Sequence, residues 1–148
     1  IEPARKGLED NLCMYYTGGE RKSGDILSEQ KNNVTHEDKF HNLKKMVTLA
    51  DDLREALHDE KIEAIGDILH KGWIYKKELA SGITNDDIDS LYDKAMKSGA
   101  TGGKLLGAGG TGFLLVYSND HEDLQKHLGC RMLPFVIDRE GTKIIFYE

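Results

Sequence analysis

The sequence is poor in proline and cysteine, with two of each among 148 residues, and it lacks both a basic excess and a long apolar run. The two cysteines, Cys13 and Cys130, are too few for a disulfide scaffold, so we expect reduced thiols in a cytoplasmic protein. The two prolines, Pro3 and Pro134, form no linker, and the length fits one domain over residues 1–148.

The charge balance and the hydropathy pattern exclude two classes of partner. A net charge of -6 and a pI of about 5.5 argue against a broad nucleic-acid surface, which needs a basic face. No apolar run approaches the ~20 residues of a membrane span, and no basic-then-apolar leader opens the chain. The six histidines show no metal-ligand spacing. We therefore expect no nucleic acid, no membrane and no metal as a direct partner.

Hydrophobic periodicity predicts interleaved strands and helices. Strand patterns cover residues 11–19, 113–118, 130–138 and 142–148, and helical patterns cover 23–30, 36–59, 62–79, 84–98 and 119–129. We expect the last two strands to form a hairpin around the turn at 139–141. This order is typical of an α+β sandwich, with helices on one face of a four-stranded, mostly antiparallel sheet.

The clearest helix covers residues 36–59, where apolar residues recur at intervals of three and four. The stripe consists of Phe40, Leu43, Met46, Val47, Ala50, Leu53 and Leu57. Such a stripe is far more often core than binding surface, so we expect it to face the interior.

Glycine is concentrated in one segment, because seven of the sixteen glycines fall between Gly99 and Gly112. Residues 107–112 read GAGGTG, which satisfies the pattern G-x-G-x-x-G. A dinucleotide site needs a strand before that loop and a helix after it, whereas here a helix precedes and a strand follows. Lys104 is followed by Leu105, so the Walker A motif is excluded as well. Two interpretations remain, a loop whose N–H groups support an anion and a packed turn without a ligand.

The stretch GGKLLGAGGTGFLLVY resembles the third conserved motif of the GHMP kinase superfamily, a glycine-rich loop before a strand in the C-terminal domain. This chain departs from the glycine run at Thr111, whose β-branched side chain narrows φ and is expected to stiffen the loop. The resemblance implies that the loop supports the nucleotide and its phosphates. The loop residues concerned are Gly107, Ala108, Gly109, Gly110, Thr111 and Gly112.

Of two further stretches, the first resembles the family and the second is similar to the subgroup that phosphorylates D-glycero-D-manno-heptose 7-phosphate. YYTGGERKSGDIL resembles the family's strand followed by Thr-Gly and Arg-x-Ser, and KKELASGITN resembles a stretch that leads to the glycine loop. The resemblance extends from about Asn11 to Ile137. The candidate substrate-binding residues are Thr17, Gly18, Arg21, Lys76, Lys77 and Lys104. Because Lys76 and Lys77 are adjacent, they cannot face the same way on a helix.

The family also carries a Pro-x-x-x-Gly-Leu-Gly-Ser-Ser phosphate loop in an N-terminal domain, and no such string occurs in this chain. The resemblance therefore implies the C-terminal domain of a sugar kinase, with a ferredoxin-like sheet and no catalytic residue of its own. It implies ATP and Mg²⁺ in the full-length enzyme, a sugar phosphate substrate and the N-terminal domain of the same protein as partner. We expect the isolated chain to be inactive or nearly so, and to self-associate through its orphaned face. The alternative is a stand-alone ferredoxin-like binding or interaction module without catalysis.

Overall fold

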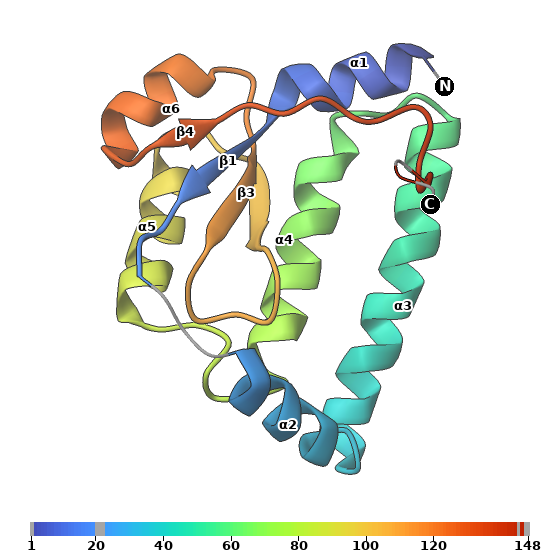
Figure 1. Ribbon diagram of the computed structural model, residues 1–148, viewed down its shortest axis with the longest axis vertical. Helices are drawn as coiled ribbons and strands as arrows, with labels where there is room; N and C mark the ends of the chain where they lie inside the picture. Colours follow the sequence, from blue (N-terminus) through green and yellow to red (C-terminus); the bar gives the residue numbers. More distant parts are fainter. Residues whose placement is uncertain (1, 20–22, 145, 147–148) are drawn as a thin grey trace.

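The computed structural model describes residues 2–19, 23–144 and 146, which form an antiparallel sheet with helices packed along it (Figure 1). In chain order, the elements of this part are α1 (Glu2–Asn11), β1 (Leu12–Tyr16), α2 (Ser23–Asn33), α3 (Glu37–His58), α4 (Ala64–Lys77), α5 (Asp86–Lys97), β2 (Gly102–Leu105), β3 (Phe113–Tyr117), α6 (His121–Leu128) and β4 (Met132–Leu133). None of the helices described has the length and apolar character that a membrane span needs.

The sheet has the order β2-β3-β1-β4, and every neighbouring pair is antiparallel. Strands β2 and β3 form a hairpin in which Gly102 pairs with Tyr117 and Leu105 pairs with Leu114. The prediction of an α+β fold with a four-stranded antiparallel sheet is confirmed, although β2 lies inside the segment that we expected to be a glycine loop throughout.

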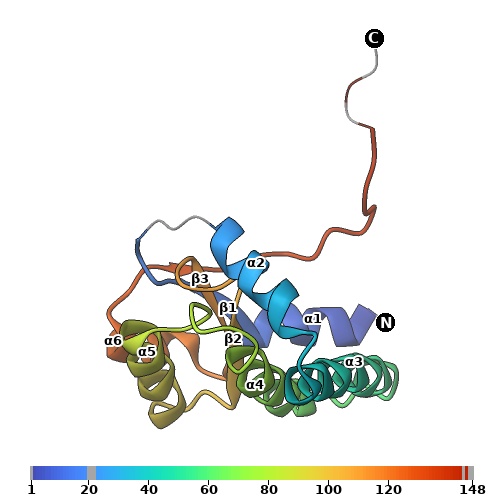
Figure 2. The ribbon, with the colours of Figure 1, turned by 90° about the horizontal axis from the view of Figure 1, so that it is seen from below.

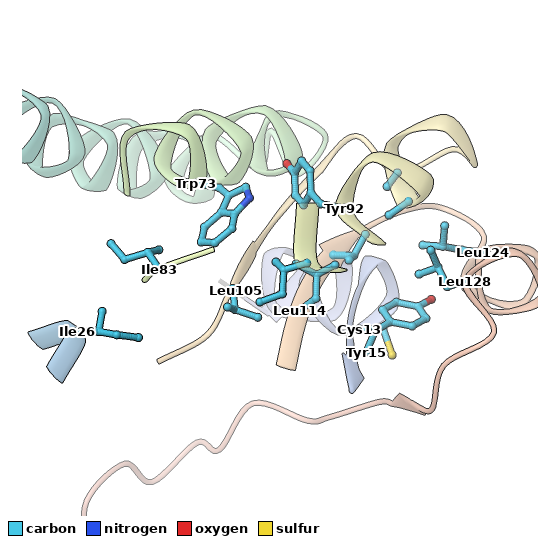
Figure 3. Packing of buried hydrophobic residues seen from close by; sticks show 14 of the residues in the cluster. Cys13, Tyr15, Ile26, Trp73, Ile83, Tyr92, Leu105, Leu114, Leu124 and Leu128 are labelled. Atoms are coloured by element: carbon cyan, nitrogen blue, oxygen red, sulfur yellow. The ribbon is translucent and has the colours of Figure 1, made fainter. Parts of the chain in front are cut away.

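Alternate side chains of the central strands supply the core (Figure 3). Tyr15 and Leu114 have no exposed surface and belong to one cluster with Trp73 of α4 and Tyr92 of α5. Tyr117 belongs instead to a second cluster, which includes residues of α3 and α4. Burying a large apolar side chain completely contributes about 2 kcal/mol to folding, so these two clusters fix the sheet against the helices.

Two glycines let α4 lie directly against the edge strand β2. A Cβ atom at Gly102 would overlap the backbone carbonyl of Gly66, and one at Gly66 would overlap the side chain of Thr101. Because no side chain separates the two backbones, α4 covers the edge of β2. The same contact brings Lys76, near the end of α4, to the loop that follows β2.

The helix α1 was not among the predicted elements. Its apolar pattern is short, since Ala4 is buried and Leu8, one turn later, is half-buried against the second cluster. A pattern of two residues is too brief to predict a helix from periodicity.

The predicted hairpin of residues 130–138 and 142–148 is wrong within the described part of the chain. Strand β4 contains Met132–Leu133 alone, and residues 134–144 form no strand. Pro134 has no N–H to donate to a ladder, and the N–H of Ile137 donates to the Glu9 carboxylate of α1 at 2.8 Å instead. Residues 145, 147 and 148 of the predicted last strand lie outside the described residues.

The apolar stripe of α3 faces the core in part. Met46 and Leu53 pack against the two clusters, whereas Phe40 and Val47 are 44% and 63% exposed. Helix α3 packs mainly against α4 at the outer end of the helical layer, with α4 between it and the sheet (Figure 2). The prediction of a single buried stripe is therefore wrong for its outer residues.

Candidate functional site

The glycine-rich turn of the β2–β3 hairpin covers residues 106–112, which we call the glycine loop. It is closed at its base by a hydrogen bond from the N–H of Leu106 to the carbonyl of Phe113, at 2.9 Å. Four loop residues have positive φ: Gly107 (77°), Gly109 (118°), Gly110 (82°) and Gly112 (125°). Residues with a Cβ atom avoid this region, so the glycines are required by the backbone path itself.

The segment before α5 holds the middle of the glycine loop. The N–H of Gly110 donates to the carbonyl of Ile83 at 2.9 Å, and the Asn85 amide donates to the carbonyl of Gly110 at 2.9 Å. The Asn85 side chain also caps α5 by accepting from the N–H of Ile88 at 3.0 Å. A Cβ atom at Gly109 would lie 2.6 Å from the Ile83 Cα atom. The stretch that ends in GITN, at residues 82–85, therefore holds the glycine loop in place.

Thr17 holds the far end of the glycine loop. Its N–H donates to the carbonyl of Gly112 at 2.9 Å, and its hydroxyl accepts from the N–H of Gly112 at 2.9 Å. A Cβ atom at Gly19 would lie 3.0 Å from the Thr111 methyl group, so Thr111 closes against this segment. Gly18 has a φ of 77°, and Arg21, also a candidate, lies outside the described residues.

Lys76 holds the start of the glycine loop. Its ammonium group donates to the carbonyl of Gly107 at 2.5 Å and, at 3.4 Å, to the carbonyl of Leu105. Burial and, to a smaller extent, the charge of Lys104 together lower the pKa of Lys76 to about 8. Sequence reasoning singled out Lys76 for its charge but missed its contact with the loop backbone.

Lys104 lies on β2 beside a cavity of about 180 Å³ between α3 and α4, whose wall includes Met46, Leu69 and Gly72. Neither Lys104 nor Lys76 has a carboxylate partner among the residues that the structure describes. The charge of Lys104 is close enough to lower the pKa of Lys76, so two ammonium groups lie near the loop with no carboxylate partner in the described part of the chain.

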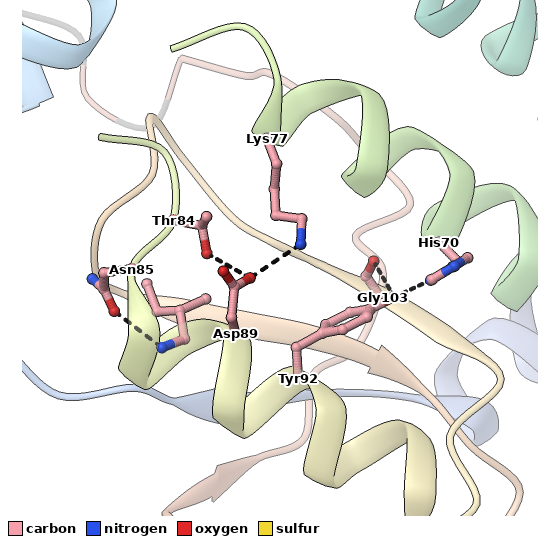
Figure 4. A network of polar contacts seen from close by, with 8 residues as sticks. His70, Lys77, Thr84, Asn85, Asp89, Tyr92 and Gly103 are labelled. Atoms are coloured by element: carbon pink, nitrogen blue, oxygen red, sulfur yellow. Dashed lines mark hydrogen bonds and ion pairs between the residues drawn. The ribbon is translucent and has the colours of Figure 1, made fainter. Parts of the chain in front are cut away.

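Lys77 points away from this pair, as expected for a neighbour of Lys76 on a helix. Its ammonium group forms an ion pair with Asp89 at 3.1 Å, and the Thr84 hydroxyl donates to the same carboxylate oxygen at 3.0 Å (Figure 4). It also lies over the Trp73 ring, 5.9 Å from the ring centre. The charge of Lys77 is therefore compensated within the protein, where it joins α4 to α5.

The arrangement can bind an anion but offers no metal centre. The N–H groups of Ala108 and Gly109 have no hydrogen-bond partner among the described residues, so they remain available to an acceptor. In the same part of the chain, no group of three or more His, Cys, Asp or Glu side chains could hold a metal ion. A larger cavity of about 640 Å³, lined by Leu8, Leu57 and Ile137 among others, lies between α1, α3 and the C-terminal segment, away from the loop.

Comparison with known proteins gives a family model, described as "GHMP kinases C terminal", that matches residues 53–133. The chain is 29% identical over 142 residues to D-glycero-alpha-D-manno-heptose 7-phosphate kinase of Campylobacter jejuni, covering 92% of this chain and 42% of that protein. It is 31% identical over 117 residues to a bifunctional fucokinase/GDP-fucose pyrophosphorylase of Arabidopsis thaliana, covering 78% of this chain and 11% of that protein. The chain thus spans less than half the length of these curated relatives.

Solved structures with the same fold include the mevalonate kinase of Methanococcus jannaschii, with a TM-score of 0.70 and 24% identity. That match covers 88% of this chain and 41% of the other. A putative sugar kinase from Campylobacter jejuni has a TM-score of 0.64 and 25% identity, covering 95% of this chain and 40% of the other.

Proposed function

The chain belongs to the GHMP kinase C-terminal family, and we propose that it is the C-terminal half of an ATP-dependent kinase acting on D-glycero-D-manno-heptose 7-phosphate. One observation supports this most directly. A glycine loop held by Lys76, Asn85 and Thr17 lies beside two lysines that have no carboxylate partner among the described residues. A rigid loop with uncompensated positive charge suits the phosphate groups of a nucleotide and a sugar phosphate.

Catalysis of phosphoryl transfer mainly requires that the protein position the reactants and neutralise their charge. ATP supplies the transferred phosphoryl group. In this proposal, the N–H groups of Ala108 and Gly109 face the nucleotide phosphates, and Lys76 keeps the loop in place while adding positive charge. Since the described residues offer no cluster of metal ligands, Mg²⁺ would be held by the N-terminal domain together with ATP. That domain would also provide the phosphate loop and the group that activates the sugar hydroxyl.

Lys104 is our candidate for recognising the phosphate that the substrate already carries. The ammonium group of Lys104 can form a charge-assisted contact with the 7-phosphate of a heptose, whereas a sugar without a phosphate, such as fucose, has no anionic group for that contact. Thr17 and Lys77 are less suited to this role, because the structure uses the first to hold the loop and pairs the second with Asp89. Heptose 7-phosphate is therefore favoured over the free sugars that fucokinases phosphorylate.

The first test is to sequence the coding DNA upstream of the Ile1 codon. A reading frame that continues for about another domain's length and contains the Pro-x-x-x-Gly-Leu-Gly-Ser-Ser loop supports the proposal. A start codon directly before Ile1 would mean that the protein has no phosphate loop. The stand-alone binding module would then be favoured over the kinase.

The second test is kinetic and uses the complete gene product. ADP release is measured with heptose 7-phosphate, free heptose and L-fucose as acceptors, and we expect turnover with the phosphorylated sugar and little with the others. Lys104→Ala should raise the KM for heptose 7-phosphate by about 10- to 100-fold, whereas the exposed α4 control Lys71→Ala should leave it unchanged. Preference for L-fucose would contradict the assigned substrate, and an unchanged KM in Lys104→Ala would contradict the assigned residue.

A further inference from the structure

The cavity of about 640 Å³ between α1, α3 and the C-terminal segment lies away from the glycine loop, and we call it the α1–α3 cavity. Each of its three walls comes from a different part of the chain, with Ala4 and Leu8 from α1, Leu57 from α3 and Ile137 from the C-terminal segment. Figure 1 shows this last segment crossing α1 toward the end of α3. Sites for small molecules have volumes of about 300–1,000 Å³, so the α1–α3 cavity is large enough for a small organic ligand.

The apolar walls of the α1–α3 cavity are held in place by contacts within the chain. Leu8 and Leu57 pack against the second core cluster, to which Tyr117 belongs. On the third wall, the N–H of Ile137 donates to the carboxylate of Glu9 in α1 at 2.8 Å. Walls that are already fixed lower the entropy cost of binding, because fewer groups have to be ordered around the ligand. The cavity therefore suits the apolar body of a ligand.

The charged groups at the α1–α3 cavity are mostly cationic. Each wall contributes one arginine, and the lining also includes one histidine and one aspartate: Arg5, Arg54, Arg139, His58 and Asp138. Three guanidinium groups against one carboxylate give this cavity a positive surplus, although the whole chain has a net charge of -6. Guanidinium groups bind carboxylates through two parallel hydrogen bonds, so the charged end of a suitable ligand is an anion.

Arg54 can exchange its present partner for such an anion. Its guanidinium group lies 3.2 Å from the carboxylate of Asp51, and the two side chains are 75% and 61% exposed. An exposed ion pair of this kind contributes little to stability, so a carboxylate in the cavity can replace Asp51 at a small cost. Arg5 and Arg139 also take part in interactions within the chain. We therefore assign the direct contact with the ligand to Arg54.

We propose that the α1–α3 cavity binds a small amphipathic carboxylate, whose apolar body lies against Leu8, Leu57 and Ile137 and whose carboxylate contacts Arg54. Asp138 lines the same cavity and repels a head group with two negative charges, so a singly charged carboxylate is favoured over a phosphate dianion. The proposal does not depend on the kinase reaction, since the cavity lies away from the glycine loop.

The experiment is a titration of the 148-residue chain followed by the NMR signals of its backbone amides. The probes are octanoate and 1-octanol, which share an alkyl chain and differ in the charge of the head group, each added up to about 3 mM. For octanoate we expect one site with a dissociation constant of about 1 mM, and the largest shifts at Leu8, Leu57 and Ile137. The neutral 1-octanol should bind at least about 5-fold more weakly.

Two variants separate the charged contact from the apolar wall. Arg54→Gln should weaken octanoate binding about 5- to 10-fold and leave 1-octanol binding unchanged, because it removes the cation alone. Arg131→Gln removes the same charge at an exposed residue outside the cavity and should change neither. Glu9→Ala should weaken both probes, because it releases the wall that carries Ile137.

Circular dichroism of each variant checks that the fold is intact, and the octanoate titration is repeated with the complete gene product, where we expect the same dissociation constant. Four results would each overturn the proposal. They are amide shifts confined to residues outside the cavity, equal binding of octanoate and 1-octanol, an effect of Arg54→Gln no larger than that of Arg131→Gln, and loss of binding in the complete gene product. The last result would mean that another part of the protein fills the cavity.

Discussion

The glycine loop and the outer side of α3, where Phe40 and Val47 are exposed, are opposite cases of how a surface is specified. In the loop, Gly109 faces backbone atoms at 2.6 Å and Gly110 is hydrogen-bonded on both its N–H and its carbonyl. On the outer side of α3, Val47 is 63% exposed. A loop of the first kind tolerates almost no substitution, whereas a helix face of the second kind tolerates many. Conformation therefore restricts the sequence of the loop, whereas exposure leaves the sequence of the outer side of α3 far less restricted.

The largest expected effect is that of Gly109→Ala. The new Cβ atom would lie 2.6 Å from the Ile83 Cα atom, and the φ of 118° is strained for any residue with a side chain. We expect the free energy of unfolding to fall by about 3 kcal/mol, measured by urea denaturation. The matched control is Gly107→Ala, which has a φ of 77° but open space around its Cβ position and should cost about 1 kcal/mol. Equal losses in both variants would show that the contact with Ile83 contributes nothing.

Asn85→Ala comes next, because it removes two contacts with one side chain. The variant loses the cap of α5 at Ile88 and the hydrogen bond to the Gly110 carbonyl. We expect a loss of about 1–2 kcal/mol in thermal or urea unfolding. Ser90→Ala, on an exposed position of the same helix, provides the control and should change stability by less than about 0.5 kcal/mol. A loss as small as the control's would mean that the segment before α5 does not hold the loop.

The sequence predicted the fold class, β1, β3 and most of the helices, because their apolar periodicity is strong and local. It missed β2, since two glycines conceal the strand, and only contacts in the folded chain explain them: Gly102 lies against the Gly66 carbonyl and Gly103 against the Leu115 carbonyl. For the site, the sequence located the loop and Lys76 but not the contacts of Asn85 and Thr17, which join segments far apart in the chain. Hydrogen bonds between distant segments leave no periodic signal, so no pattern in the sequence could reveal them.

A third prediction concerns the charge of Lys76. Since its pKa is about 8, the ammonium group loses its proton as the pH rises through that value. With sulfate as the probe in isothermal titration calorimetry, we expect affinity to fall up to about tenfold between about pH 7 and about pH 9.5. Lys76→Arg keeps its charge over this range and should give a flatter profile. Identical profiles would place the bound anion away from Lys76.

The same shift has the opposite effect on folding. The pKa of Lys76 is lowered in the folded state, so the folded chain releases this proton before the unfolded chain does. The unfolded state then binds more protons between about pH 8 and the ordinary lysine pKa of 10.5, and stability rises with pH in that window. Comparing urea denaturation of the wild type and Lys76→Arg across this window isolates the contribution. A wild type that gains no stability relative to the variant would contradict the burial of this ammonium group.

The smallest effect is expected on the outer side of α3, where Val47→Thr removes apolar surface without changing the shape of the side chain. Because Val47 is 63% exposed, its replacement should change the free energy of unfolding by less than about 0.5 kcal/mol. The measurement is urea denaturation. Ala56→Thr, at a buried position of the same helix, should be clearly more destabilising because it buries a hydroxyl group. A loss in Val47→Thr equal to that in Ala56→Thr would mean that Val47 belongs to the core, and the contrast between the glycine loop and the outer side of α3 would disappear.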